Sequence, residues 1–362
     1  MLADRHDNPL VYQDSFYKYK KIKSILVHDG GMRDKPFVSI MIPTYRRPEL
    51  LCEAIESALN QKTSIPFEVI VVDNECNPDI SELVDRSIRR FTNHNLRVYR
   101  NQKNLGMFGN WNRCLELANG NYATILSDDD VLKPNFIQSS ASQVFGQEFV
   151  AVSVGHFGGM LPSSNKVGAI KNTIKKIRDM VWYKSGVRMV KLADIMVGNP
   201  VAGVLGVLFS KEAAIKIGGF NEKYWPSADY VFVSRYWLHF GGRILKEEAA
   251  AYRWEINESF NPATASRFIE INLKLRDAII ENIKERGLNT WCLEKTKIFQ
   301  AQLQANLYIE KFNLKEKCDE IFLASSLSKV KIPFPQVTSW LLLLFFYFSP
   351  NNQKVKPEAL EN

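Results

Sequence analysis

Short apolar runs alternate with amphipathic helical stretches between residues 37 and 126, and this alternation constrains the fold more than any other feature. The runs are rich in β-branched residues and are bounded by turn-forming residues, a pattern typical of buried strands. With about 25–30 residues per strand–helix unit, the pattern predicts an open, mostly parallel sheet with helices on both faces. The expected strands are 37–42, 67–72, 96–100 and 122–126, and the expected helices are 48–61, 80–91 and 107–118.

Polar residues follow three of these strands at their carboxyl ends. Residues 43–45 follow the first strand, residues 73–74 follow the second, and three consecutive aspartates, 128–130, follow the fourth. In sheets of this type, ligands bind outside the carboxyl ends of the strands. The sequence therefore predicts a ligand site at one edge of the sheet, built from segments that are far apart along the chain.

The adjacent aspartates Asp128, Asp129 and Asp130 need a physical explanation. Two unit charges about 4 Å apart repel by roughly 1 kcal/mol in bulk water, and by more where the dielectric constant is lower. A fold tolerates such a cluster when water solvates it, when hydrogen-bond donors cap it, or when a cation binds there. The residues alone leave these three explanations open.

Composition narrows the class of protein. Hydrophobic residues make up 46% and charged residues 24% of the 362 residues, which allows a large core and argues against disorder. The formal net charge of +8 favours anionic partners such as phosphorylated small molecules or an acidic membrane surface. The lysine clusters lack interleaved aromatic residues, so no nucleic-acid partner is expected. The five scattered cysteines contain no CxxC pair, which indicates reduced thiols in a cytosol.

The second half of the chain has a different pattern. Residues 201–209 are typical of another buried strand, and Ser210 is expected to cap a short helix that Gly218 and Gly219 end. A helical pattern then extends from 267 to 329. We therefore expect a helical region after the α/β part.

An apolar stretch lies near the C-terminus. Residues 340–348 are nine consecutive apolar residues, flanked by Lys329, Lys331, Lys354 and Lys356. A spanning helix needs about 20 apolar residues, so this segment is expected to dip into one leaflet or lie at the interface. A core or oligomer-interface helix and a true span remain alternatives. No signal peptide is expected, and the expected location is cytoplasmic, peripheral on the inner face of the cytoplasmic membrane, with the oligomeric state open.

Five motifs, taken in order, carry a resemblance to a known family. They read VSIMIPTYRR, VIVVDN, NLGMFGNWNRCLELANGNY, ILSDDDVLKPN and GGFNEKYWPSADYVF. Together they resemble the family 2 glycosyltransferases, which have the GT-A fold and move a sugar from a nucleotide diphosphate donor, usually with inversion. The implied organisation is an N-terminal extension (1–36), a GT-A glycosyltransferase domain (37–260), a helical subdomain (261–330) and an apolar membrane-associating tail (331–362).

The resemblance accounts for the acidic cluster through a metal ion. A departing diphosphate carries a large negative charge, which Mn²⁺ or Mg²⁺ can offset through hard oxygen ligands. In the family's Asp-x-Asp-Asp register, where Ser127 takes the first position, Asp129 is the implied metal ligand. Asp130 is then an additional ligand or a loop cap, and Asp128 faces the ribose or the donor sugar. The other register, with Asp128 and Asp130 as a DxD pair, remains open.

Nucleotide-binding residues are also implied by the resemblance. Asp73 matches a base-contacting aspartate that suits uracil, although its neighbourhood departs from the family's Asp-Asp-x-Ser. Asn110 and Asn112 either form part of the wall of the nucleotide site or face solvent. Arg47 either contacts phosphate or is an ordinary surface residue. The residues implied to surround the nucleotide are Pro43, Thr44, Tyr45, Arg46, Asp73, Asn104 and Gly106.

The implied general base is Asp229. A carboxylate must accept a proton from the acceptor hydroxyl as it attacks the anomeric carbon. The family commonly offers Glu-Asp here, and in this chain Ala228 replaces the glutamate. Asp229 could alternatively cap a helix beginning at the next residue, and Trp225 is a sugar-stacking or core residue. Glu255 stands near a slot that often holds histidine, and its role is left open.

The leading hypothesis is an inverting, metal-dependent glycosyltransferase that favours a UDP-sugar. Its acceptor is expected to be a lipid-linked or growing glycan in bacterial surface polysaccharide synthesis, such as O-antigen or capsule. One alternative is a nucleotidyltransferase on a similar sheet. A non-catalytic scaffold that binds nucleotide or glycan at the membrane is another.

Overall fold

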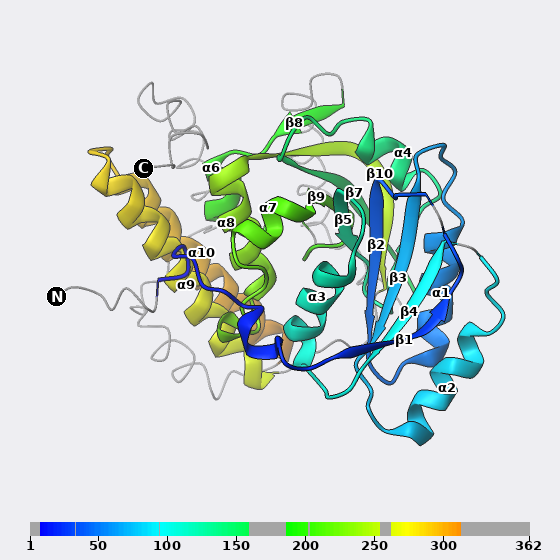
Figure 1. The fold of residues 1–362 in the computed structure, drawn as a ribbon. Coiled ribbons are helices and arrows are strands. Elements are labelled where there is room, and N and C mark those ends of the chain that lie inside the picture. Colours follow the sequence, from blue (N-terminus) through cyan, green and yellow to red (C-terminus); the bar gives the residue numbers. More distant parts are fainter. Residues whose placement is uncertain are drawn as a thin grey trace.

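The computed structural model describes residues 8–32, 34–93, 95–158, 186–201, 203–253 and 262–312. Within these residues one mixed sheet has the strand order β1-β4-β3-β2-β5-β9-β7-β10-β6, with β8 paired to β10 (Figure 1). The strands are β1 (Ser24–Asp29), β2 (Val38–Thr44), β3 (Phe67–Asp73), β4 (Leu96–Asn101), β5 (Tyr122–Ile125), β6 (Val131–Leu132), β7 (Phe149–Phe157), β8 (Val187–Met189), β9 (Val207–Ser210) and β10 (Gly242–Arg253).

Helices cover both faces of this sheet (Figure 1). Helices α1, α2 and α4 contribute to one apolar core, and helices α3, α7 and α8 contribute to the other, which extends to α9 and α10. The helices are α1 (Pro48–Leu59), α2 (Pro78–Ile88), α3 (Gly106–Leu117), α4 (Phe136–Ala141), α6 (Leu192–Val197), α7 (Lys211–Lys216), α8 (Ala228–Phe240), α9 (Pro262–Glu285) and α10 (Trp291–Phe312), with short 3-10 turns η2 (Tyr17–Tyr19) and η3 (Glu222–Tyr224).

The central strands are buried on both faces, which is why their sequences are almost continuously apolar. Successive side chains of a strand point to opposite faces. Met41 and Ile70 therefore belong to the core that contains α3 and α8, while Ile40 and Val69 belong to the core that contains α1. This packing explains why β2, β3 and β5 form recognisable apolar runs in the sequence.

The four expected strands run parallel to one another in the order β4-β3-β2-β5. Thr44, the last residue of β2, lies opposite Asp73, the last residue of β3. Strand β5 pairs with the other side of β2, so the turn that follows β5 reaches the same edge. The α/β fold with flanking helices is confirmed, and antiparallel strands extend it on either side.

The N-terminal segment is joined to the sheet, which the sequence pattern does not predict. Strand β1 pairs antiparallel with β4. Arg113 of α3 donates to the Tyr19 carbonyl at 3.0 Å and to the Ser24 hydroxyl at 3.1 Å, and the Ser15 N–H donates to the Gly218 carbonyl at 3.1 Å. Residues 15–24 thus cross from the α7 end of the molecule to the β4 edge.

Two element boundaries that bear on the site differ from expectation. The strand expected from residue 201 begins only at Val207, because residues 203–206 form turns in which Gly203 and Gly206 have φ of +65° and +69°. Glycine adopts this left-handed conformation without steric cost. Helix α8 begins at Ala228, two residues before the expected start, so Asp229 lies in its first turn.

The described part of the C-terminal region is helical, as expected. Ile271, Leu275, Ile279 and Ile283 of α9 are buried in the core shared with α8. The apolar tail, with residues 340–348, lies outside the described residues. Among the described helices, none combines the length and apolar character needed to cross a membrane.

Candidate active site

The three aspartates lie in the turn between β5 and β6. The Asp130 N–H donates to the Ser127 carbonyl at 3.1 Å, which closes the turn. Asp128 points toward the end of β2, where its Oδ2 accepts from the Thr44 hydroxyl at 2.8 Å and from the Tyr45 N–H at 3.4 Å. The structure therefore brings the acidic turn and the segment after β2 into direct contact.

Two arginine side chains and the backbone N–H of Arg253 surround the acidic turn. Arg47 Nη1 lies 2.8 Å from Asp129 Oδ2 and 3.4 Å from Asp128 Oδ1. At the end of β10, the Arg253 N–H donates to Asp130 Oδ1 at 3.0 Å, and its Nε donates to the Asp129 carbonyl at 2.9 Å. The repulsion among the carboxylates is thus offset by hydrogen-bond donors and by positive charge.

Burial raises the pKa of two of the three carboxyls. Asp128 is 7% and Asp130 is 3% exposed. Desolvation raises the pKa of Asp128 to about 6, although the Thr44 hydroxyl and Arg47 act in the opposite direction. Desolvation, with added repulsion from Asp129 and Asp128, raises the pKa of Asp130 to about 7. Such perturbed carboxyls in a recess are typical of functional sites.

A cavity of about 370 Å³ opens beside this turn, and we call it the central cavity. Asp130 faces it from the acidic turn, and Asp229 faces it from α8. Asp128 and Asp129 do not line it. Other lining residues are Trp111, Ser127, His156, Gly203 and Tyr252. Two carboxylates from the fourth and fifth of the sequence motifs therefore share one small space.

Asp229 is held at the start of α8. Its Oδ2 accepts a 3.2 Å hydrogen bond from Asn199 Nδ2, which also donates to the Gly203 carbonyl at 3.1 Å. The protein encloses the carboxyl apart from the cavities it faces, and this burial raises its pKa, whereas the Tyr230 N–H and Asn199 act to lower it. A carboxylate with a raised pKa and one hydrogen-bonded oxygen is suited to accept a proton.

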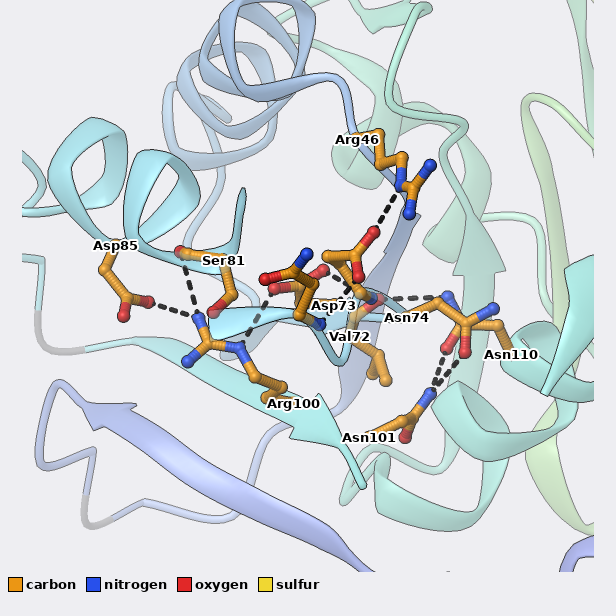
Figure 2. A network of polar contacts seen from close by, with 11 residues as sticks. Arg46, Val72, Asp73, Asn74, Ser81, Asp85, Arg100, Asn101 and Asn110 are labelled. Carbon is orange, nitrogen blue, oxygen red and sulfur yellow. Dashed lines mark hydrogen bonds and ion pairs between the residues drawn. The ribbon is translucent and has the colours of Figure 1, made fainter. Parts of the chain in front are cut away.

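Asp73 is fully buried at the end of β3. Its Oδ2 accepts from Arg100 Nε at 3.1 Å, and its Oδ1 accepts from the Glu75 N–H at 2.9 Å (Figure 2). Arg100 also pairs with Asp85 of α2 at 2.5 Å. Asp73 has no exposed surface, so a direct contact with a base would require the residues around it to move, and that role stays a prediction.

A network of asparagines joins the ends of β3 and β4 to α3 (Figure 2). Asn74 donates to Asn104 Oδ1 at 3.0 Å and to the Gly106 carbonyl at 3.2 Å, and Asn101 donates to Asn74 at 3.0 Å and to Asn110 at 2.8 Å. Gly106 has φ of +72°, and a Cβ added to it would meet nothing within 4 Å. Asn104 and Gly106 therefore form an open surface supported from below by buried amides.

Arg46 and Arg47 point to different partners. Arg46 Nε donates to the carboxylate of Glu75, a residue that is 2% exposed. Arg46 also has φ of +61°, a conformation that is uncommon for a residue with a side chain. The segment after β2 is thus bent so that one arginine contacts the β3 loop and the other contacts the acidic turn.

Of the other residues considered for the site, two are buried, one is exposed and one lies outside the described residues. Asn110 and Asn112 are each 3% exposed, so neither faces solvent. Asn112 exchanges two 2.8 Å hydrogen bonds with the backbone of Phe220. Trp225 is 42% exposed and does not line the central cavity. Glu255 lies outside the described residues.

Comparisons with known proteins identify the family. The family model described as glycosyl transferase family 2 matches residues 39–192. An uncharacterized glycosyltransferase of Methanocaldococcus jannaschii is 34% identical over 269 residues, which cover 74% of this chain and 81% of the relative. The chain belongs to the family 2 glycosyltransferases. The expected family and enzyme class are thereby confirmed.

Two further comparisons describe the neighbours of this glycosyltransferase. A Campylobacter jejuni GalNAc(5)-diNAcBac-PP-undecaprenol beta-1,3-glucosyltransferase is 36% identical over 103 residues, covering 27% of this chain and 31% of the relative. A mannosyltransferase from Pyrobaculum calidifontis, solved in complex with GDP-Man and Mn²⁺, has a TM-score of 0.50 and 14% identity, and the match covers 95% of this chain and 89% of that chain. The second likeness supports the GT-A fold.

The donor set at the acidic turn of this glycosyltransferase fits a hard divalent cation. All three side chains offer carboxylate oxygens, the ligands that Mg²⁺ and Mn²⁺ prefer. Within the described residues, no three carboxylate, histidine or cysteine side chains are grouped closely enough to hold a metal ion unaided. Mg²⁺ commonly takes one or two protein carboxylates and completes its shell with water and substrate phosphate oxygens. The turn matches this arrangement.

Several residues that shape the site could not be assigned from the sequence. Asn199 lies 30 residues before Asp229, and Arg253 lies 123 residues after Asp130, so no local motif connects them. Glu75 lies in the stretch after Asp73 that departs from the family pattern, and it pairs with Arg46. These contacts depend on the topology of the glycosyltransferase sheet, because it brings β5, β10 and α8 together.

Proposed function

We propose that this glycosyltransferase transfers one sugar from a nucleoside diphosphate donor to an acceptor hydroxyl, with inversion and with help from a divalent metal ion. The observation that carries the proposal is the central cavity, because Asp130 and Asp229 both line it. A single displacement needs charge compensation at the leaving diphosphate and a base at the attacking hydroxyl. The cavity offers one carboxylate for each of these tasks.

Asp229 is the proposed general base. It accepts the proton of the acceptor hydroxyl through the oxygen that faces the cavity, while Asn199 holds the carboxylate by a 3.2 Å hydrogen bond. The enclosed surroundings raise its pKa, which increases its basicity once it is ionised. Inversion follows when the hydroxyl attacks from the Asp229 side and the diphosphate leaves toward the acidic turn.

Asp129 and Asp130 would hold Mn²⁺ or Mg²⁺, which when bound offsets the negative charge of the departing diphosphate. The Pyrobaculum calidifontis mannosyltransferase, which shares the fold, was solved with Mn²⁺, and this supports the choice of metal. Arg47 lies 2.8 Å from Asp129 and supplies further positive charge beside the diphosphate. Asp128, bonded to Thr44 at 2.8 Å, fixes the segment after β2 next to the ribose or donor sugar.

The nucleotide is proposed to lie along the ends of β2 and β3. A UDP-sugar is favoured by the family resemblance, and a GDP-sugar is the competing donor because the mannosyltransferase was solved with GDP-Man. The open surface at Gly106, where an added Cβ meets nothing, allows a ligand to approach the backbone closely. The proposed donor-contacting residues are Pro43, Thr44, Tyr45, Arg46, Asp73, Asn104, Gly106 and Asp128, and Trp225 is the proposed sugar contact on the acceptor side.

The acceptor is proposed to be a lipid-linked or growing glycan of a bacterial surface polysaccharide. The name of the Campylobacter jejuni relative, a glucosyltransferase acting on a PP-undecaprenol-linked glycan, supports this class. The net charge of +8 and the apolar stretch at 340–348 suit a chain that works at an anionic membrane surface. We therefore place the protein on the cytoplasmic face of the membrane.

A thermal-shift screen tests the donor half of the proposal. UDP, GDP, dTDP and CDP are each added with and without Mn²⁺, because a ligand that binds only the folded state raises the melting temperature. At least one nucleotide is expected to stabilise the protein only when Mn²⁺ is present. That metal-dependent shift should vanish in Asp129→Ala and in Asp130→Asn. A shift that is equal in both variants and in the wild type would remove the acidic turn from the proposal.

The base assignment is tested with Asp229→Asn. Donor binding should persist, while transfer should fall by roughly 100-fold or more, since general base catalysis contributes on that scale. The matched control is Asp277→Asn, which makes the same change at an exposed position on α9. Near-normal turnover of Asp229→Asn would show that another group accepts the proton.

A further inference from the structure

Arg47 contacts the carboxylate that is proposed to hold the metal ion. Its Nη1 lies 2.8 Å from Asp129 Oδ2 and 3.4 Å from Asp128 Oδ1. The Asp129 side chain is 28% exposed, against 9% for Asp128, so Asp129 is the more accessible of the two. Two cations that share one carboxylate lie close enough to repel each other strongly. Arg47 and a divalent ion therefore compete for Asp129.

The Arg47 side chain can leave Asp129 without a change in the backbone. It is 46% exposed, and although Arg47 is the N-cap residue of α1, its side chain makes no capping hydrogen bond. The backbone before it is held by other contacts, because the Thr44 hydroxyl donates to Asp128 at 2.8 Å and Arg46 donates to Glu75. A rotation of one exposed side chain is enough, and such rotations take picoseconds to nanoseconds.

Arg253, the second arginine at the acidic turn, is held differently. Its N–H donates to Asp130 Oδ1 at 3.0 Å, its Nε donates to the Asp129 carbonyl at 2.9 Å, and its Nη2 pairs with Glu53 of α1. The side chain is only 12% exposed. Arg253 therefore braces the backbone of the turn, whereas Arg47 contacts the side chain of Asp129.

A nucleoside diphosphate offers Arg47 another partner. The planar guanidinium group pairs well with phosphate oxygens, often through two parallel hydrogen bonds. The proposed function sets the diphosphate beside the acidic turn, within reach of Arg47, and the present inference rests on that placement. When Arg47 turns from Asp129 to a phosphate, the carboxylate becomes available to a divalent ion. Positive and negative charges remain matched in both arrangements.

We propose that Arg47 is an internal counter-ion that competes with the metal ion for Asp129, and that its transfer to the diphosphate couples metal binding to nucleotide binding. Each ligand favours the arrangement in which Arg47 has left Asp129, so each raises the affinity for the other. Linkage makes this coupling reciprocal, and couplings between sites typically change affinity by about 5–150-fold. The metal ion is therefore held weakly until the donor binds.

The first test measures Mn²⁺ binding to the full chain without nucleotide, from the electron paramagnetic resonance signal of free Mn²⁺. Arg47→Gln removes the competing charge and should bind Mn²⁺ at least about fivefold more tightly than the wild type. Arg47→Lys keeps the positive charge and should bind Mn²⁺ more weakly than Arg47→Gln. If Arg47 only stabilised the turn, Arg47→Gln would bind Mn²⁺ less tightly, so an equal or lower affinity overturns the inference.

The matched control is Arg86→Gln. Arg86 lies on α2 and forms an exposed ion pair with Glu82 at 2.7 Å, which is close to the length of the Arg47–Asp129 pair. Its replacement removes the same charge from the chain at a distant position. The Mn²⁺ affinity of Arg86→Gln should equal that of the wild type. A gain in affinity as large as that of Arg47→Gln would attribute the effect to net charge and would also overturn the inference.

The second test repeats the Mn²⁺ titration with the nucleotide that gives the largest thermal shift among UDP, GDP, dTDP and CDP. The ratio of the Mn²⁺ dissociation constants without and with that nucleotide measures the coupling. In Arg47→Gln the ratio should fall at least about fivefold below the wild-type ratio, because only the direct attraction between metal ion and phosphate remains. A ratio equal to that of the wild type would overturn the proposed transfer of Arg47.

The two tests separate this inference from the proposed function. Tighter Mn²⁺ binding by Arg47→Gln, in a protein whose wild type shows no Mn²⁺-dependent nucleotide shift, would contradict the proposed donor and support the competition for Asp129. A wild type that shows the nucleotide shift but binds Mn²⁺ as tightly as Arg47→Gln would leave the proposed function intact and overturn the role of Arg47.

Discussion

At the residue scale, the proposed reaction depends on how Asp229 is held. Its Oδ2 accepts from Asn199, whose side chain also bonds the Gly203 carbonyl, so one amide connects the base to the turns before β9. Asp229 could be selected from the sequence because it stands in a recognisable motif. Asn199 could not, because an asparagine before a proline carries no signal of a partner that lies 30 residues away.

The Asn199 contact predicts a change in the pH profile. Asn199 lowers the pKa of Asp229 by stabilising its charged form, against the larger effect of burial, which raises it. Removing the amide in Asn199→Ala should raise this pKa further. Since the base must be ionised, the acidic limb of the kcat profile should move to higher pH.

The measurement is kcat against pH for the wild type and for Asn199→Ala, at saturating donor. The control is Asn289→Ala, an exposed asparagine between α9 and α10. An acidic limb that stays in place while kcat falls uniformly would mean that Asn199 positions the carboxylate without affecting its protonation.

At the element scale, the buried strands were predictable and the exposed or glycine-broken ones were not. Strands β2 and β3 are apolar on both faces because both faces are covered. Strand β1 keeps Ile25, Leu26 and Val27 more than a third exposed and sits at the edge of the sheet, where burial imposes no pattern. The strand expected from residue 201 begins only at Val207 for a different reason, because two glycines with positive φ turn the chain before it.

Tyr236 links α8 to the sheet through two hydrogen bonds, so its substitution measures what this link contributes to the free energy of unfolding. Its hydroxyl accepts from the Ser210 N–H at 2.9 Å and donates to the Gln147 carbonyl at 2.6 Å, and the residue is 1% exposed. Tyr236→Phe removes both bonds and leaves the buried Ser210 N–H and the part-buried Gln147 carbonyl without this partner. The free energy of unfolding should fall by about 1–3 kcal/mol.

Urea denaturation followed by circular dichroism measures this loss. The matched control is Tyr17→Phe, because Tyr17 is 75% exposed and should change stability by less than about 0.5 kcal/mol. Equal midpoints for Tyr236→Phe and the wild type would show that water replaces the lost bonds.

At the scale of the whole molecule, net charge and the apolar tail predict membrane association. Basic segments are attracted to anionic lipids by about 1 kcal/mol per lysine or arginine near the surface. A chain truncated after Ile332 should therefore sediment less with anionic vesicles than the full chain. Both should remain unbound with neutral vesicles. Undiminished sedimentation of the truncated chain would place the attachment among the remaining residues.

The path of the N-terminal segment has a consequence for synthesis. Tyr19 and Lys18 contact Glu222, more than 200 positions later in the chain, and Ser15 contacts Gly218. Residues 15–19 therefore find these partners only after the chain up to Gly218 and Glu222 has been translated. Closing so long a loop is slow compared with local contacts, so this polypeptide cannot mature strictly from its start to its end. A bulky tag fused before residue 8 would therefore be attached to a segment that makes its native contacts late in synthesis.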